Sequence, residues 1–152
     1  MSAHHATVLW TLDDGDFRKR RYSRAHRLIF AGGVEIPGSP ATAIVPLPFS
    51  RADAADPESM FTASLSACHM MWFLDLAARG GFTITEYRDE AEGELGKMPA
   101  TGKMGMTKVT LRPKITFTGE KLPTTEDLAR LHHAAHEACF IANSVTTEVV
   151  VE

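Results

Sequence analysis

The amino-acid sequence predicts a single α+β domain, residues 1–152, in which two helices pack on antiparallel strands. Residues 57–79 have the composition and the end signals of a long helix. Residues 82–95 and 106–119 alternate between apolar and polar side chains, as half-buried strands do. The length of 152 residues agrees with one hydrophobic core, because domains commonly contain about 100 to 200 residues.

The N-terminal third of the chain predicts a short antiparallel meander. Residues 6–12 have strand composition, and the Asp-rich segment that follows suits a turn. Residues 20–30 predict a second strand, which a hairpin turn at Gly32 and Gly33 joins to a third. The prolines between residues 37 and 56 remove backbone donors, so we expect an irregular connection there.

A long helix is predicted from Pro57 to Arg79. Asp56 precedes it as the N-cap, Pro57 suits the first helical position because its missing N–H has no helical partner, and Gly80 follows its end. At 1.5 Å per residue the helix would be roughly 34 Å long. Most of its circumference is apolar or small, so other structure must cover it.

The second half of the chain predicts two paired strand segments, a second helix and a last strand. Residues 82–95 and 106–119 are expected to pair across the connection 96–105. Thr124 and Asp127 form a weakened capping box at the start of a helix whose apolar residues recur at helical spacing. Residues 144–152 have strand composition and close the domain.

Composition and charge narrow the class of protein. The chain is 44% hydrophobic and 23% charged, which is typical of a globular protein, and its net charge of −3 gives no general reason to bind nucleic acid. The N-terminal segment lacks the basic start and apolar run of a signal peptide, and polar residues interrupt the longest apolar stretches. We therefore expect a soluble, cytoplasmic protein with no membrane partner.

Cys68 lies in the middle of the predicted long helix and is the first candidate for chemistry. Its neighbours one turn away are Ser64, Leu65, Met71 and Trp72, and Phe61 lies two turns back. The apolar wall of Phe61, Leu65, Met71 and Trp72 favours a hydrophobic ligand. Burial disfavours a thiolate, so an active Cys68 requires a cation brought close to it. Within the helix, His69 is rotated about 100° away and Arg79 lies three turns further on.

The basic segment 18–27 can supply such a cation from elsewhere in the fold. It contains six basic residues, and one inward-facing arginine would suffice. The alternative interpretation is a solvated strand edge on which charge discourages pairing with other chains.

Metal and nucleotide cofactors are not indicated. Two cysteines 71 positions apart form neither a CxxC pair nor a four-cysteine zinc site, and they can equally be buried structural thiols. His132 and His136 share a helix face, but an HExxH pattern is missing, so surface or capping roles are the simpler interpretation. The Gly-Gly pairs lack the context of a phosphate-binding loop.

The block "DPESMFTASLSACHMMWFLDLAARGGF" resembles the Asp/Asn-Pro-Glu and Ala-Cys-His helix of the OsmC/Ohr family, the osmotically inducible and organic hydroperoxide resistance proteins. The segments "YSRAH" with "AGG", "ITEYRDEAEG" and "AHEACFIANSV" extend the similarity over nearly the whole chain. The resemblance implies a fold with N-terminal antiparallel strands, a long central helix, further antiparallel strands, a second helix and a C-terminal strand. It also implies an intertwined homodimer.

The resemblance implies roles for individual residues. Cys68 would be the attacking thiolate and Cys139 its resolving partner. Counting back from the Gly-Gly turn places the activating arginine at Arg24, with Arg21 and Arg27 as alternatives, and Glu58 would hold that arginine. Cys139 is followed by Phe140, where many relatives have proline.

The implied activity is that of a stress-response antioxidant enzyme, a thiol peroxidase that reduces organic hydroperoxides through a Cys68 sulfenic acid and a Cys68–Cys139 disulfide. A dithiol reductant of the lipoyl type would reopen the disulfide. One competing interpretation is a non-catalytic protein that binds a small organic anion in the same apolar pocket. The other is a nucleic-acid module on residues 18–27, whose binding would depend steeply on salt.

Overall fold

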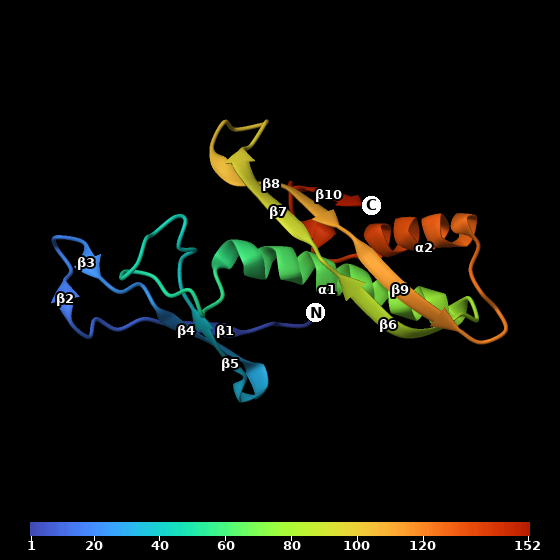
Figure 1. Ribbon diagram of the computed structural model, residues 1–152, viewed down its shortest axis with the longest axis horizontal. Helices are drawn as coiled ribbons and strands as arrows, with labels where there is room; N and C mark the ends of the chain where they lie inside the picture. Colours follow the sequence, from blue (N-terminus) through green and yellow to red (C-terminus); the bar gives the residue numbers. More distant parts are fainter. The chain divides into compact units, whose positions relative to one another are not determined.

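A computed structural model describes all 152 residues, and its two helices and several sheets confirm the predicted α+β architecture (Figure 1). The chain divides into two compact units, Met1–Met60 and Phe61–Glu152. A single domain spanning 1–152 therefore stays a prediction. Neither helix is long and apolar enough to cross a membrane.

The first unit contains a three-stranded antiparallel sheet in the order β1-β4-β5. Its strands are β1 (Ala6–Leu9), β4 (His26–Phe30) and β5 (Glu35–Gly38), and the predicted turn between the last two contains Gly32 and Gly33 with φ of 82° and 79°. A small hairpin joins β2 (Gly15–Asp16) to β3 (Arg21–Tyr22). As predicted, no regular element lies between Gly38 and Pro57.

The segment predicted as one strand, 20–30, forms two strands with a break at residues 23–25. Backbone groups in the break bond outside any ladder. The N–H of Arg24 donates to Phe49 O at 3.0 Å, and the indole of Trp10 donates to Ser23 O at 2.8 Å. The break was not predicted, because the alternation of side chains in residues 20–30 does not indicate hydrogen bonds to residues as distant in the sequence as Trp10 and Phe49.

Helix α1 (Pro57–Arg79) has the predicted bounds. One carboxylate oxygen of Asp56 accepts the backbone N–H of Ser59 at 2.9 Å and the other accepts its hydroxyl at 2.7 Å, which confirms Asp56 as the cap. The helix ends where Gly81 adopts a φ of 79° and the N–H of Phe82 donates back to Ala77 O at 3.0 Å.

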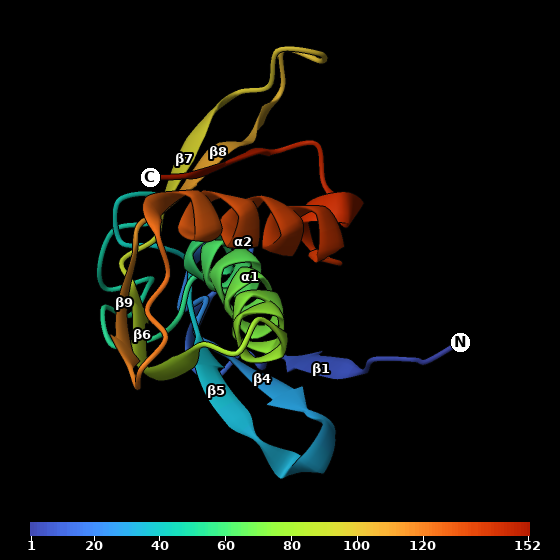
Figure 2. The ribbon, with the colours of Figure 1, turned by 90° about the vertical axis from the view of Figure 1, so that its right-hand side faces the viewer.

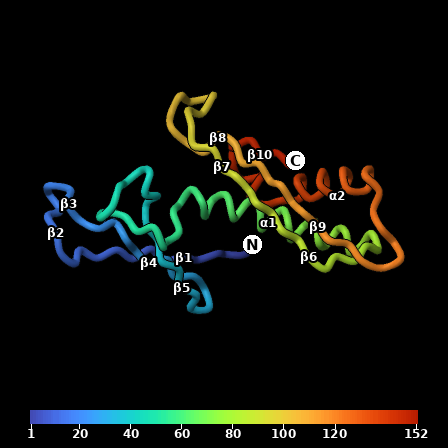
Figure 3. Tube along the Cα trace, in the orientation of Figure 1, coloured from blue at the N-terminus to red at the C-terminus, as the bar shows by residue number.

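Two sheets of the second unit follow the predicted pairings. Strand β6 (Thr83–Asp89) pairs with β9 (Pro113–Thr118), and β7 (Glu92–Lys97) pairs with β8 (Met104–Leu111), both antiparallel. Figure 3 traces the connection from β7 to β8 as a hairpin that extends beyond both sheets. The last strand, β10 (Glu148–Val151), forms within the predicted closing segment and runs parallel to β8.

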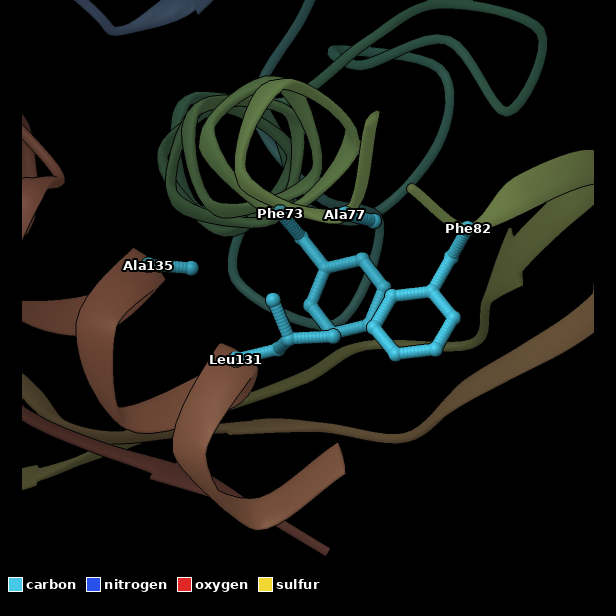
Figure 4. Packing of buried hydrophobic residues seen from close by; sticks show 5 residues of the cluster. All are labelled: Phe73, Ala77, Phe82, Leu131 and Ala135. Carbon is cyan, nitrogen blue, oxygen red and sulfur yellow. The ribbon is translucent and has the colours of Figure 1, made fainter. Parts of the chain in front are cut away.

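Helix α2 (Thr125–Ala138) begins with the predicted capping box, in which Thr124 and Asp127 bond each other's backbone N–H groups. Figure 2 shows α2 crossing α1. The contact between the helices is a core of fully or nearly buried side chains (Figure 4), Phe73, Ala77, Phe82, Leu131 and Ala135. A second core forms where Leu65 meets Val109 and Leu111 of β8.

Candidate functional site

The two cysteines come together where α2 ends against α1. Cys139 is the C-cap of α2, its N–H donates to His136 O at 3.1 Å, and its thiol lies close enough to Cys68 of α1 for that residue to shift its pKa. Both are free thiols and both are buried, with exposed fractions of 7% for Cys68 and 1% for Cys139. The fold therefore places the two sulfurs within reach of each other, although 71 positions separate them in the sequence.

The environment of Cys139 favours its protonated form. Burial raises the pKa of the Cys139 thiol, and its hydrogen bond and charge repulsion with Cys68 raise it further. The N–H of Ala142, which donates to Cys139 Sγ at 3.4 Å, acts in the opposite direction.

A cavity of about 410 Å³ opens beside Cys68. Met71 and Trp72, two of the four residues expected to form an apolar wall near Cys68, line it together with Phe140. The rings of Trp72 and Phe140 meet edge to face, with centroids 5.5 Å apart and an interplanar angle of 88°. The residue after Cys139 therefore closes one wall of the cavity on which Cys68 opens.

Phe61 and Leu65 lie elsewhere. Leu65 is 1% exposed and packs in the second core, and Phe61 packs against the same cluster. Of the four residues expected to line one pocket, Met71 and Trp72 line the cavity, whereas Phe61 and Leu65 pack in the interior.

An ion pair sits at the same cavity. Arg79 Nη2 lies 2.9 Å from Asp75 Oδ2, and both residues line the cavity with Cys68. The Arg79 side chain is 72% exposed, so the pair is worth less than about 1 kcal/mol and can exchange partners. A cationic group of α1 is therefore available to an anion entering the cavity.

The candidate activating arginines differ in their partners. The guanidinium of Arg24 donates to Tyr22 O at 2.8 Å and to Arg20 O at 3.2 Å, and its Cζ lies 4.3 Å from the Tyr22 ring centroid. Arg27 instead forms an exposed ion pair with Glu35 at 3.1 Å.

The remaining candidates are Arg21, an alternative activating arginine, and Glu58, the predicted partner of the arginine. Arg21 is exposed in β3, and Glu58 lies in the first turn of α1. A relay from Glu58 through Arg24 to Cys68 stays a prediction.

His69, the residue after Cys68, points into the protein and is 1% exposed. Its Nε2 lies 3.0 Å from Nδ1 of His132 on α2, and the two rings are nearly parallel, 8° apart. No group of three or more His, Cys, Asp or Glu side chains is placed to hold a metal ion. His132 thus bonds a buried histidine of α1.

Four residues of this region had no part in the site predicted from the sequence, although Arg79, His132 and Phe140 were considered there in other respects. Asp75 and Arg79 follow Cys68 at intervals of seven and eleven residues, which place them on one helix face with Met71 and Trp72. That spacing could have indicated them. Phe140 and His132 come from α2 and the segment after it, and their approach depends on how the helices cross.

Comparisons with known proteins agree on one family. The model of the OsmC-like protein family matches residues 50–152. The structure of an OsmC-like protein of unknown function from Vibrio cholerae is 48% identical, with a TM-score of 0.97 over 100% of this chain and 99% of that one. No curated protein sequence matches the chain.

More distant structures share the fold. The organic hydroperoxide resistance protein OhrB of Bacillus subtilis is 23% identical, with a TM-score of 0.64 over 97% of this chain and 96% of that one. An organic hydroperoxide resistance protein from Elizabethkingia anophelis is 20% identical, with a TM-score of 0.70 over 99% and 93%.

Proposed function

The chain belongs to the OsmC-like protein family, and from this premise we propose that it is a thiol peroxidase that reduces organic hydroperoxides to alcohols. The observation that carries the proposal is the buried Cys139 beside a Cys68 that lines a mainly apolar cavity. Two structures with the same fold are of organic hydroperoxide resistance proteins, which supports the substrate class.

In the first chemical step, the Cys68 thiolate attacks the peroxide oxygen farther from the carbon group. The O–O bond breaks, the alkoxide leaves and takes up a proton to become the alcohol, and Cys68 becomes a sulfenic acid. Met71, Trp72 and Phe140 would hold the organic group of the substrate in the cavity.

In the second step, the Cys139 sulfur displaces hydroxide from the Cys68 sulfenic acid. A disulfide forms, and the hydroxide leaves as water with the proton of the Cys139 thiol. The protonated state that its surroundings favour for Cys139 suits this step, because the Cys139 thiol supplies the proton that the departing hydroxide takes up. An external dithiol, of the lipoyl type by family resemblance, then supplies two electrons and two protons to restore both thiols.

Arg24 is the arginine that we propose to stabilise the Cys68 thiolate, with Glu58 as its partner. The guanidinium of Arg24 contacts two backbone carbonyls and the Tyr22 ring. These contacts are neutral, so they do not cancel its positive charge. Arg27 has part of its charge compensated by Glu35.

Mass spectrometry after one equivalent of cumene hydroperoxide tests the proposal. The wild-type protein should gain a Cys68–Cys139 disulfide, whereas Cys139→Ser should stop at a Cys68 sulfenic acid that dimedone traps. Cys68→Ser should lose turnover entirely. A folded wild-type protein whose Cys68 remains a free thiol after the hydroperoxide is added contradicts the proposal.

Binding of an organic anion without chemistry is the second candidate, and Arg79 at the cavity is the observation that favours it. Under this alternative, Cys68→Ser binds a long-chain carboxylate as tightly as the wild type, and Arg79→Gln binds it less tightly. Calorimetric titration of both variants separates the two functions.

A homodimer is proposed from the family resemblance and from the long apolar helix. In the single chain, α1 leaves Met71 60% and Leu74 36% exposed, and Phe140 beside them is 68% exposed. Sedimentation equilibrium should give twice the mass of the chain. A monomer at micromolar concentration would contradict this assignment.

A further inference from the structure

The buried pair His69–His132 joins α1 to α2 one residue away from the site sulfur. His69 Nε2 and His132 Nδ1 are 3.0 Å apart, and the His132 ring also packs on Phe73, with centroids 4.4 Å apart. His69 is 1% exposed, and Phe73 is completely buried. This contact is therefore a fixed part of the interior.

The surroundings of His69 determine which nitrogen carries its proton. Its other nitrogen, Nδ1, is buried and has no hydrogen-bond partner. A buried N–H donor without a partner is costly, whereas an unpaired acceptor is tolerated more easily. The proton of His69 therefore belongs on Nε2, where it is donated to the lone pair on His132 Nδ1.

The same face of α2 carries His132 and, seven residues later, Cys139. Seven residues are nearly two helical turns, so the two side chains point in almost the same direction about 10 Å apart along the axis. On α1 their partners are the consecutive residues His69 and Cys68. Two contacts at different points along α2 thus fix the angle at which α2 crosses α1.

We propose that His69 and His132 are positioning residues that hold Cys139 against Cys68 and thereby set the rate of disulfide formation. This inference rests on the proposed peroxidase function for its biological meaning. The pair acts on the second chemical step, in which the Cys139 sulfur displaces hydroxide from the Cys68 sulfenic acid. Neither histidine lines the cavity beside Cys68, so oxidation of Cys68 itself should not depend on the pair.

Two substitutions at one position separate the hydrogen bond from the ring. His132→Phe keeps an aromatic ring against Phe73 but removes the acceptor for His69. His132→Asn keeps an acceptor close to the position of Nδ1. His133→Phe is the matched control, because His133 is the exposed neighbour on the same helix.

Stopped-flow measurement should record sulfenic acid and disulfide formation separately after cumene hydroperoxide is added. In His132→Phe, sulfenic acid should form at the wild-type rate and disulfide about tenfold more slowly or worse, since misplacement by about 1 Å can cost up to 100-fold. Cys68 should then be overoxidised to sulfinic acid by excess hydroperoxide. His132→Asn and His133→Phe should stay within about threefold of the wild type.

Disulfide formation with diamide tests the geometry without a hydroperoxide, because diamide itself accepts the two electrons and two protons. A slow diamide reaction in His132→Phe supports the inference even if hydroperoxides prove not to be substrates. Wild-type disulfide rates in a folded His132→Phe, with either oxidant, overturn it. If His132→Phe does not fold, imidazole ¹⁵N NMR of the wild type decides: a proton on Nδ1 of His69 overturns the inference, and one on Nε2 supports it.

Discussion

Acidification should destabilise the protein through His69. Burial, and repulsion from His132 and His136 when they are protonated, lower the pKa of His69 from 6.5 to about 4, with Asp89 acting in the opposite direction. The unfolded chain therefore binds a proton at this residue more readily than the folded chain does. The stability that neutral His69 provides is complete above pH 6.5 and is lost progressively as the pH falls to about 4.

The size of the effect follows from the same values. A pKa lowered from 6.5 to about 4 corresponds to a loss of about 3 kcal/mol, at about 1.4 kcal/mol per tenfold change in proton affinity. Typical domains unfold at a cost of about 5 to 15 kcal/mol, so the loss would be a large share of the total. His132, His136 and Asp89 also act on His69, and all three are retained when His69 alone is replaced. Comparison with a variant at position 69 therefore isolates the contribution of His69.

Urea denaturation at several pH values between about 7 and 4, followed by tryptophan fluorescence, measures the free energy of unfolding. His69→Gln is the control, because glutamine retains a side-chain N–H for His132 and does not titrate. The wild type should lose about 3 kcal/mol more than His69→Gln between these pH values. Parallel losses within about 0.5 kcal/mol would show that His69 is not held neutral by its surroundings.

Three further substitutions test other parts of the structure. Phe73→Ala should lower the free energy of unfolding by about 3 to 5 kcal/mol in urea denaturation, because it empties the core between the helices. Thr124→Ala should lower it by about 1 kcal/mol through loss of the capping box, and an unchanged value would assign that box no energetic role. Arg24→Met should slow Cys68 oxidation by about tenfold or more in single-turnover assays, whereas Arg27→Met should leave it unchanged; equal effects would contradict the assignment of Arg24.

The parts of the fold that depend on neighbouring residues in the sequence were predictable. Asp56, Pro57 and Gly80 mark both ends of α1 because helix caps are local, and the pairing of β7 with β8 follows from the alternation of side chains on either side of one turn. The parallel pairing of β10 with β8 was not predicted, because it depends on the path that the chain takes through α2.

The lining of the cavity beside Cys68 was predictable where α1 alone supplies it. Met71 and Trp72 follow Cys68 at helical spacing and line the cavity, but the same rule applied toward the N-terminus selected Phe61 and Leu65, which are packed in the core. Helical periodicity gives the direction in which a side chain points from its helix, but it does not show which other element packs on that side. Strand β8 covers Leu65, whereas a cavity lies beside Cys68.

The order Cys68-His69 has a physical explanation in the two faces of α1. One face of the helix is buried against strands and α2, and its residues are spaced mostly by three or four positions. The adjacent face lines the cavity, and its residues have a similar spacing. Consecutive residues differ by about 100° around a helix, so Cys68 lies at the seam and His69 lies wholly inside. Both faces carry mainly apolar side chains, with Asp75 and Arg79 as the charged residues of the cavity face, which accounts for the largely apolar composition of this helix. A sulfur at the seam can meet the cavity on one side and Cys139 on the other, and a residue fixed in the core directly after it prevents the helix from rotating that sulfur away.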